Sequence, residues 1–176
     1  DRLSGQVNET VHLAQLDNAQ VLYIDKRNAT KPIEMYSQAG KVGPVYCTGV
    51  GKVMLAFSDD AVIDAVVAQQ SFHKFTDATL TSGEKLRTEL ADIRANGYGF
   101  DREEHEPGII CVAMPILNDH NRVLGGVSVT SSTQRTNLAG LELLVPFLRD
   151  AAQNISRDAQ NWSFPDYAKQ QSTTGI

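Results

Sequence analysis

Two hydroxyl side chains, Ser128 and Thr130, stand two residues apart in an apolar run of the sequence. Side chains alternate between the faces of a strand, so both hydroxyls would point to one face, together with the small Gly126. Cys111, in the preceding apolar run, shares that face if the two runs pair as a hairpin. Such a face could hydrogen-bond a small molecule docked on the sheet. The spacing alone is more typical of hydroxyls that face solvent, so it leaves the binding interpretation open.

A glycine-rich segment, Gly49-Val50-Gly51-Lys52, offers a different chemistry. It fails as a phosphate-binding loop, because Tyr46 stands where the first glycine is needed and Val53 where Ser or Thr is needed. As the start of a helix it would still present unpaired N–H groups and a partial positive charge, which suit a carboxylate. An ordinary tight turn into a helix explains the same residues equally well.

A thiol-based enzyme is an alternative. Cys111, His105 and either Glu103 or Asp101 could supply a thiolate, a base and an orienting carboxylate. However, a lone cysteine inside an apolar strand is usually a small core residue, and no catalytic signature surrounds this one.

A metal site is a weaker alternative. Its candidate ligands lack the close spacing typical of zinc sites; they are Cys47, His105, Cys111 and His120. The acidic residues Glu103, Glu104 and Glu106 are predicted to form a solvated loop.

The elements that must position these residues follow from periodicity and turn signals. Strands are predicted over residues 10–16, 21–26, 33–37, 108–117 and 122–129, with a loop over 38–44. Helices are predicted over 51–57, 59–69, 83–95 and 138–162, the last broken at Pro146, with Thr48 as an N-cap. Hairpin signals dominate and strict strand–helix alternation is absent, so an α+β fold with a mostly antiparallel sheet is expected.

The alternation also sorts the central hairpin by face. Its first strand places Ile110, Val112 and Met114 on one side, opposite Ile109, Cys111 and Ala113. Its second strand is expected to carry one continuous apolar face, formed by Val123, Gly125, Val127 and Val129.

Composition excludes several classes of protein. A chain of 176 residues fits one domain with a sizeable core. Its net charge of −5 and the lack of a basic stripe argue against nucleic-acid binding by this chain alone. No apolar run approaches the roughly 20 residues that span a bilayer, so no membrane partner is expected. The two cysteines, Cys47 and Cys111, are expected to be free thiols in a reducing cytoplasm.

Two segments carry a resemblance. They are GPVYCTGVGKVMLA (residues 43–56) and GYGFDREEHEPGIICVAMPI (97–116), the latter followed by GGVSVTSSTQR (125–135). In combination they resemble the effector-binding domain of the IclR family of bacterial transcriptional regulators, over about residues 9–161. Within the family, the chain is most similar to regulators of sugar-acid catabolism. The resemblance implies a GAF-like domain with a curved antiparallel sheet flanked by helices.

The resemblance also implies a site. At the matching positions the family holds the effector carboxylate with a glycine and its neighbour, here Gly49 and Val50. The implied polar contacts are Asp101, Cys111, Ser128 and Thr130, and the implied apolar walls are Met35 and Ile109. Thr130 replaces a common family serine, and its extra methyl group implies a slightly smaller or reoriented ligand.

The implied protein senses a small organic acid, a sugar acid or a keto acid, and needs no cofactor. Residues 1–8 would end a linker helix from a missing N-terminal winged helix-turn-helix domain, through which alone it would bind DNA. Residues 9–162 would form the effector-binding domain and 163–176 a disordered tail. A cytoplasmic repressor that forms dimers and tetramers is expected. The alternatives are a small thiol- or metal-dependent enzyme acting on sugar acids, and an interaction module without a ligand.

Overall fold

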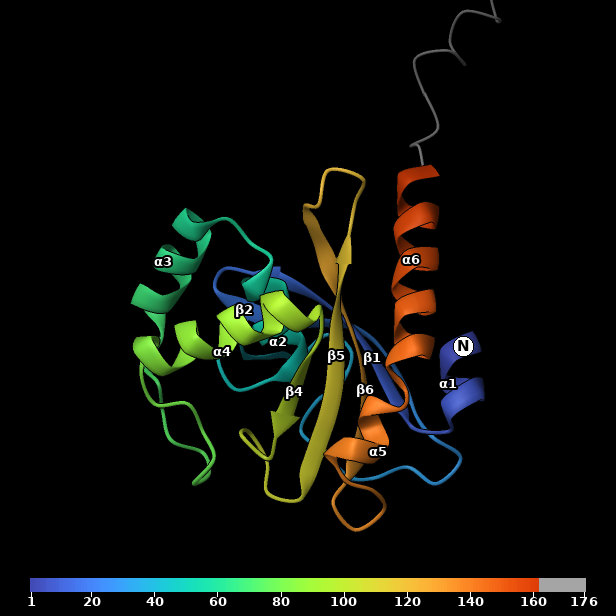
Figure 1. Cartoon of the computed structure of the whole chain (residues 1–176). Helices are drawn as coiled ribbons and strands as arrows, with labels where there is room; N and C mark the ends of the chain where they lie inside the picture. Colours follow the sequence, from blue (N-terminus) through green and yellow to red (C-terminus); the bar gives the residue numbers. More distant parts are fainter. Residues whose placement is uncertain (162–176) are drawn as a thin grey trace, which may run out of the picture.

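The computed structural model describes residues 1–161, which fold around one antiparallel sheet of six strands in the order β3-β2-β1-β6-β5-β4 (Figure 1). The strands are β1 (Thr10–Asp17), β2 (Gln20–Arg27), β3 (Val42–Pro44), β4 (Gly99–Arg102), β5 (Ile109–Leu117) and β6 (Val123–Ser132). The helices are α1 (Arg2–Val7), α2 (Gly49–Ala56), α3 (Asp60–Gln69), α4 (Gly83–Asn96), α5 (Leu138–Glu142) and α6 (Val145–Asn161). The predicted α+β class and the antiparallel sheet are confirmed.

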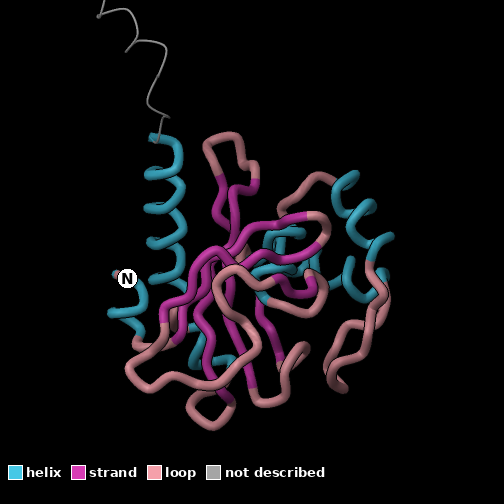
Figure 2. Tube along the Cα trace, turned by 180° about the vertical axis from the view of Figure 1, so that it is seen from behind, coloured by secondary structure: helices cyan, strands magenta, loops and turns pink. Residues whose placement is uncertain are grey.

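Helices cover both faces of the sheet. In Figures 1 and 2, α1, α5 and α6 lie on one side of the strands, and α2, α3 and α4 lie on the other. Each face has its own apolar cluster: Val112, Val129 and Leu148 belong to the α6 side, whereas Val53 and Leu86 belong to the α2 side. The sheet is therefore buried on both faces, and a polar residue on any central strand must find a partner inside the protein.

The β5–β6 hairpin forms in the predicted register. Cys111 pairs with Thr130 and Val112 with Val129, so the hydroxyl face turns toward α2 and the valine face toward α6. Asn118 shapes the turn, because its side-chain oxygen accepts hydrogen bonds from the backbone N–H groups of His120 and Arg122.

One part of the predicted β6 face is wrong. The register shifts at the end of the hairpin, where Leu117 pairs with Val123 although Ile116 pairs with Gly125. This bulge leaves Leu124 as an extra residue and reverses the alternation beyond it. Val123 therefore packs on the α2 side and Leu124 on the α6 side.

The predicted strand over residues 33–37 is also wrong. The segment has no strand pairing, and the short edge strand β3 lies in the stretch expected to be a loop. The backbone N–H of Tyr36 donates instead to both oxygens of the Glu106 carboxylate, at 2.9 and 3.1 Å. The Lys26 ammonium donates to the carbonyl of Ser37 at 2.8 Å. Side chains, rather than a neighbouring strand, therefore provide the hydrogen-bond partners of these backbone groups.

The helices match their predictions closely. Helices α3 and α4 begin and end within one residue of the expected bounds, and Gly97 ends α4 with a φ of 81°. The last helix restarts as expected, with Pro146 in the first turn of α6. Helix α2 begins at Gly49, two residues before the predicted start. Thr48 takes its N-cap position, but its hydroxyl donates to the carbonyl of Pro44 rather than capping the first turn.

Candidate functional site

A small cavity lies on the α2 side of the sheet, between the start of α2, the strands and the 35–37 segment. All eight residues singled out in the sequence line it: Met35, Gly49, Val50, Asp101, Ile109, Cys111, Ser128 and Thr130. Six further lining residues were not among the predicted ligand contacts: His12, Tyr23, Ser37, Thr48, His105 and Glu106. The fold thus brings together residues that lie up to 118 positions apart.

One side of the cavity is the N-terminus of α2, a helix whose residues are all buried. Its first N–H groups have no partner within the helix and carry the positive end of the helix dipole. Gly49 lets this end approach the sheet, because a Cβ atom there would lie 2.3 Å from the Cys111 sulfur and 3.3 Å from the Cβ of Ala113. The glycine is required by strand β5, and the resulting geometry leaves the helix end facing the cavity.

The opposite side is a cluster of hydroxyls around His12. The ring Nδ1 lies 3.4 Å from the Ser128 hydroxyl and 3.3 Å from that of Thr130, and Nε2 lies 2.8 Å from the Ser37 hydroxyl. Burial, with a contribution from Lys26, lowers the pKa of His12 to about 3. The ring is therefore neutral at physiological pH. Ser128 and Thr130 are buried, so the interpretation that they face solvent is wrong.

Asp101 closes the cavity from β4. Its carboxylate accepts a hydrogen bond from the backbone N–H of Glu104 at 2.8 Å. Burial, followed by the nearby Glu104, raises the pKa of Asp101 to about 7. A carboxyl group that is partly protonated near neutral pH repels an anionic ligand less and can donate a proton to one of its oxygens.

The thiol in the cavity is not activated. Burial and the neighbouring Asp101 raise the pKa of Cys111, whereas a nucleophilic cysteine needs a lowered pKa. His105, the base of the hypothetical triad, packs edge-on against Tyr36 and Phe75. The arrangement lacks the thiolate that catalysis would require.

Beneath the site, a buried lysine anchors the acidic segment. Lys52 of α2 has no exposed side-chain surface and forms ion pairs with Glu104 and, at 3.0 Å, with Glu89. Arg102 contacts the same Glu89 at 2.7 Å. The prediction of a solvated acidic loop is therefore wrong for Glu104, which is 2% exposed. The sequence did contain a signal for this ion pair. Lys52 lies within an apolar helix, and a buried lysine needs an acidic partner.

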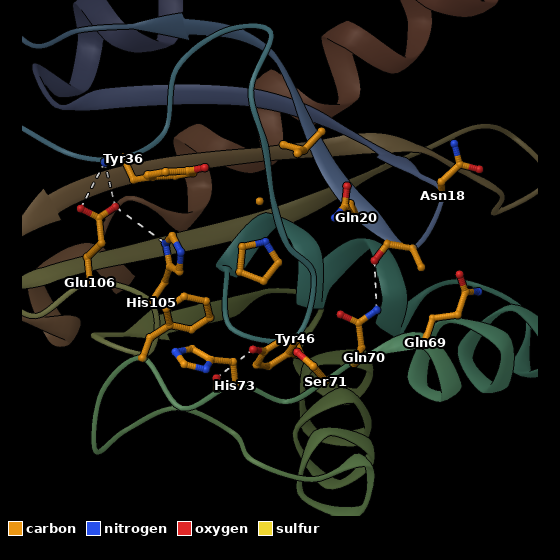
Figure 3. A pocket seen from close by; sticks show the side chains of 15 residues that line it. Asn18, Gln20, Tyr36, Tyr46, Gln69, Gln70, Ser71, His73, His105 and Glu106 are labelled. Carbon is orange, nitrogen blue, oxygen red and sulfur yellow. Dashed lines mark hydrogen bonds and ion pairs between the residues drawn. The ribbon is translucent and has the colours of Figure 1, made fainter.

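An open cleft of about 790 Å³ adjoins the cavity, and Figure 3 shows its lining. His105 and Glu106 line both spaces, and Tyr36 lies in the cleft between Met35 and Ser37, which line the cavity. We place the candidate site in the cavity rather than in the larger cleft, because the buried polar groups converge in the cavity.

The cavity must open to admit a metabolite. Its volume is about 30 Å³, and one buried water needs about 10–15 Å³ of such space. Its other walls are strands of the sheet and a buried helix, whereas the 35–37 and 105–106 segments form an irregular wall. The bonds from Tyr36 N–H to Glu106 hold these segments together (Figure 3), so we expect opening to break them.

The thiol of Cys111 can report this opening. Glu106→Ala, in a Cys47→Ala background, should speed the reaction of Cys111 with an aromatic disulfide reagent by at least about tenfold, because losing a hydrogen bond to a charged group costs about 1.5–3 kcal/mol. Absorbance of the released thiolate measures the rate.

The matched control is Glu34→Gln, which removes a charge from an exposed residue of the same segment and should leave the rate unchanged. Equal rates in Glu106→Ala and the parent would show that the cavity opens elsewhere.

Two features of other classes of protein are not seen within residues 1–161. No group of three or more His, Cys, Asp or Glu side chains there could hold a metal ion. None of the helices in this range is long and apolar enough to span a membrane.

A polar cavity between an antiparallel sheet and a buried helix N-terminus is typical of small-molecule-binding domains. The chain belongs to the IclR family: the family model described as "Bacterial transcriptional regulator IclR C-terminal" matches residues 1–157. It is the effector-binding domain of a transcriptional regulator and is not an enzyme. The GAF-like relationship and the domain boundaries stay predictions, and Trp162 and the 163–176 tail lie outside the described residues.

Curated relatives support this assignment. The HTH-type transcriptional regulator KdgR of Escherichia coli K12 is 34% identical over 163 residues, which cover 93% of this chain and 62% of the relative. XynR from the same organism is 36% identical over 155 residues, 88% of this chain and 62% of the relative. The chain thus spans about three fifths of the length of these regulators.

Solved structures share the fold. The C-terminal domain of E. coli KdgR superposes with a TM-score of 0.80 at 33% identity, covering 89% of this chain and 90% of that one. The inducer-binding domain of a double mutant of PobR from Acinetobacter, in complex with 3-hydroxybenzoic acid, gives a TM-score of 0.76 at 26% identity, covering 88% and 91%.

Proposed function

We propose that this domain binds a small carboxylic acid, of the sugar-acid or keto-acid type, in the cavity between α2 and the sheet. The observation that carries the proposal is that two chemically different sides face each other across one small cavity. The N-terminus of α2 suits a carboxylate, and the hydroxyls around His12 suit the neutral oxygens of the same ligand. The PobR domain, whose complex holds a hydroxylated aromatic acid, supports an acid as the class of ligand.

We further propose that occupancy of the cavity controls DNA binding by a separate N-terminal winged helix-turn-helix domain, and that the whole protein is a cytoplasmic repressor. The chain corresponds to about three fifths of relatives that are named HTH-type regulators, and its net charge of −5 does not suit contact with phosphates. The ligand would act by binding one arrangement of a dimer or tetramer more tightly than another, and only to the extent of that difference.

The experiment that tests the proposal is calorimetric titration with a panel of keto, aldonic and hydroxybenzoic acids. Ser128→Ala and Thr130→Val should each weaken the best acid by roughly 0.5–1.5 kcal/mol, or by up to about 3 kcal/mol if the ligand oxygen is charged. The melting temperature of the unliganded domain should change little, because each variant removes one hydroxyl and hardly alters the packing.

Val127→Ala is the matched control on the same strand. Val127 directly precedes Ser128 and faces the α6 cluster, so its truncation should cost on the order of 1–3 kcal/mol of stability and leave affinity nearly unchanged. The proposal fails if no acid in the panel binds the wild-type domain. If Ser128→Ala melts early and binds normally, the ligand lies elsewhere.

A further inference from the structure

His12 is a group in the cavity that the proposed function leaves without a role. It lies on β1, with Ser128 of β6 opposite on one side and Lys26 of β2 on the other. Its side chain packs against the ring of Tyr23, with 5.3 Å between the ring centroids, and the residue is 2% exposed. Burial and the contact with Tyr23 therefore keep the ring oriented toward the cavity.

Three hydroxyls compete for the two nitrogens of this ring. Ser37 alone lies beside Nε2, whereas Ser128 and Thr130 both lie beside Nδ1. A neutral imidazole has one N–H and one lone pair, so Nδ1 can pair fully with only one of its two neighbours at a time. The other hydroxyl keeps its donor and its lone pairs for a partner in the cavity.

The His12 ring also determines which ligand charge can be bound on its side of the cavity. Burial and Lys26 keep it neutral, so it offers a second anion no compensating charge. A carboxylate here could only accept hydrogen bonds, and in one tautomer it would face the ring's lone pair. A ligand hydroxyl both donates and accepts, so it fits either tautomer and either orientation of the two protein hydroxyls.

We propose that His12 is the specificity-determining residue of this cavity, and that it orients Ser37, Ser128 and Thr130 to accept a ligand hydroxyl and to reject a second carboxylate. The inference rests on the proposed function, because it names which acids the site takes. They are monocarboxylic acids with at least one hydroxyl away from the carboxylate. The carboxylate lies at the N-terminus of α2, and the hydroxyl lies among β1, β6 and the 35–37 segment.

Two matched pairs of probes test this. D-gluconate and D-glucarate differ only at the last carbon, a hydroxyl in one and a carboxylate in the other; 4-hydroxybenzoate and terephthalate make a rigid pair. In calorimetry, the wild-type chain should bind the hydroxyl member of the better pair at least about tenfold more tightly. His12→Phe should weaken that member about 5- to 30-fold and reduce the preference to below about threefold.

A conservative variant distinguishes a specific role of His12 in ligand preference from a purely structural one. His12→Asn can place a polar atom near the position of Nδ1, so it should recover part of the preference that His12→Phe loses. Ser37→Ala removes the Nε2 partner without altering β1, and it should lower the preference even if His12→Phe folds poorly. His120→Phe changes an exposed histidine in the hairpin turn and should match the wild type.

The outcomes are distinguishable. Wild-type chain that binds no member of either pair, nor any other acid, would remove the proposed function and this inference together. Wild-type chain that binds both members of a pair equally would leave the proposed function in place and overturn the role of His12. So would an unchanged preference in folded His12→Phe or in Ser37→Ala.

Discussion

Replacing Lys52 with methionine should reduce the free energy of unfolding by about 3–5 kcal/mol, because removing one partner of a buried ion pair leaves the other charge uncompensated. The lysine is fully buried between Glu104 and Glu89. It contacts Oε1 of Glu104, and Oε2 of the same carboxylate is buried without a hydrogen-bond partner among the described residues. Denaturant unfolding at pH 7 measures the loss. Lys85→Met, an exposed lysine on α4, should stay within about 0.5 kcal/mol of the wild type.

Two further measurements isolate the charge. Adding Glu104→Gln to Lys52→Met should recover part of the lost stability, because the double variant buries no unpaired carboxylate. Burial already raises the pKa of Glu104, against the effect of Lys52, and without Lys52 that pKa rises further. The folded variant then binds a proton that the unfolded chain releases, so its stability falls as pH rises. The loss relative to wild type should be smaller at pH 5 than at pH 7; equal losses would mean that Lys52 does not control the protonation of Glu104 in this range.

Local sequence signals predicted most of the fold. Alternating β-branched residues predicted the β5–β6 hairpin and the face that Cys111 shares with Thr130, because alternation acts over a few residues. The helices followed from 3.6-residue periodicity. The strand predicted over residues 33–37 was wrong because a distant side chain decided the local structure. Glu106 satisfies the backbone of the 35–37 segment, and nothing within that segment indicates it.

The candidate site was predicted unevenly for a similar reason. The eight lining residues came from short motifs and the family resemblance, and they do share one cavity. His12 was missed because a histidine that alternates with Val11 and Leu13 is typical of a strand with one wet face. Here β1 is central and both of its faces are covered, so His12 is buried with Thr10 and Ala14. Burial on both sides depends on the order of strands in the sheet, which periodicity does not encode.

Gly49→Ala should weaken binding of the best acid by at least about tenfold, equivalent to about 1.4 kcal/mol, and should also destabilise the domain by about 1–3 kcal/mol. The two losses share a cause. The new methyl group would lie 2.3 Å from the Cys111 sulfur, so the start of α2 must move away from β5, and its N–H groups move with it. Calorimetry and denaturant unfolding of the same preparation measure both. Gly5→Ala, in α1 with nothing within 4 Å of the new atom, is the matched control and should reduce neither affinity nor stability.

The compensating variant shows whether the helix end itself holds the ligand. In Gly49→Ala/Cys111→Ala the new methyl group takes the place of the sulfur, so α2 can return to its position. Stability should come back to within about 1 kcal/mol of Cys111→Ala alone, since volume-conserving exchanges in a core are tolerated. Affinity should return with it, because backbone N–H groups bind the carboxylate and the double variant restores their position. If Gly49→Ala is destabilised yet binds acid as tightly as the wild type, the N-terminus of α2 is not part of the site.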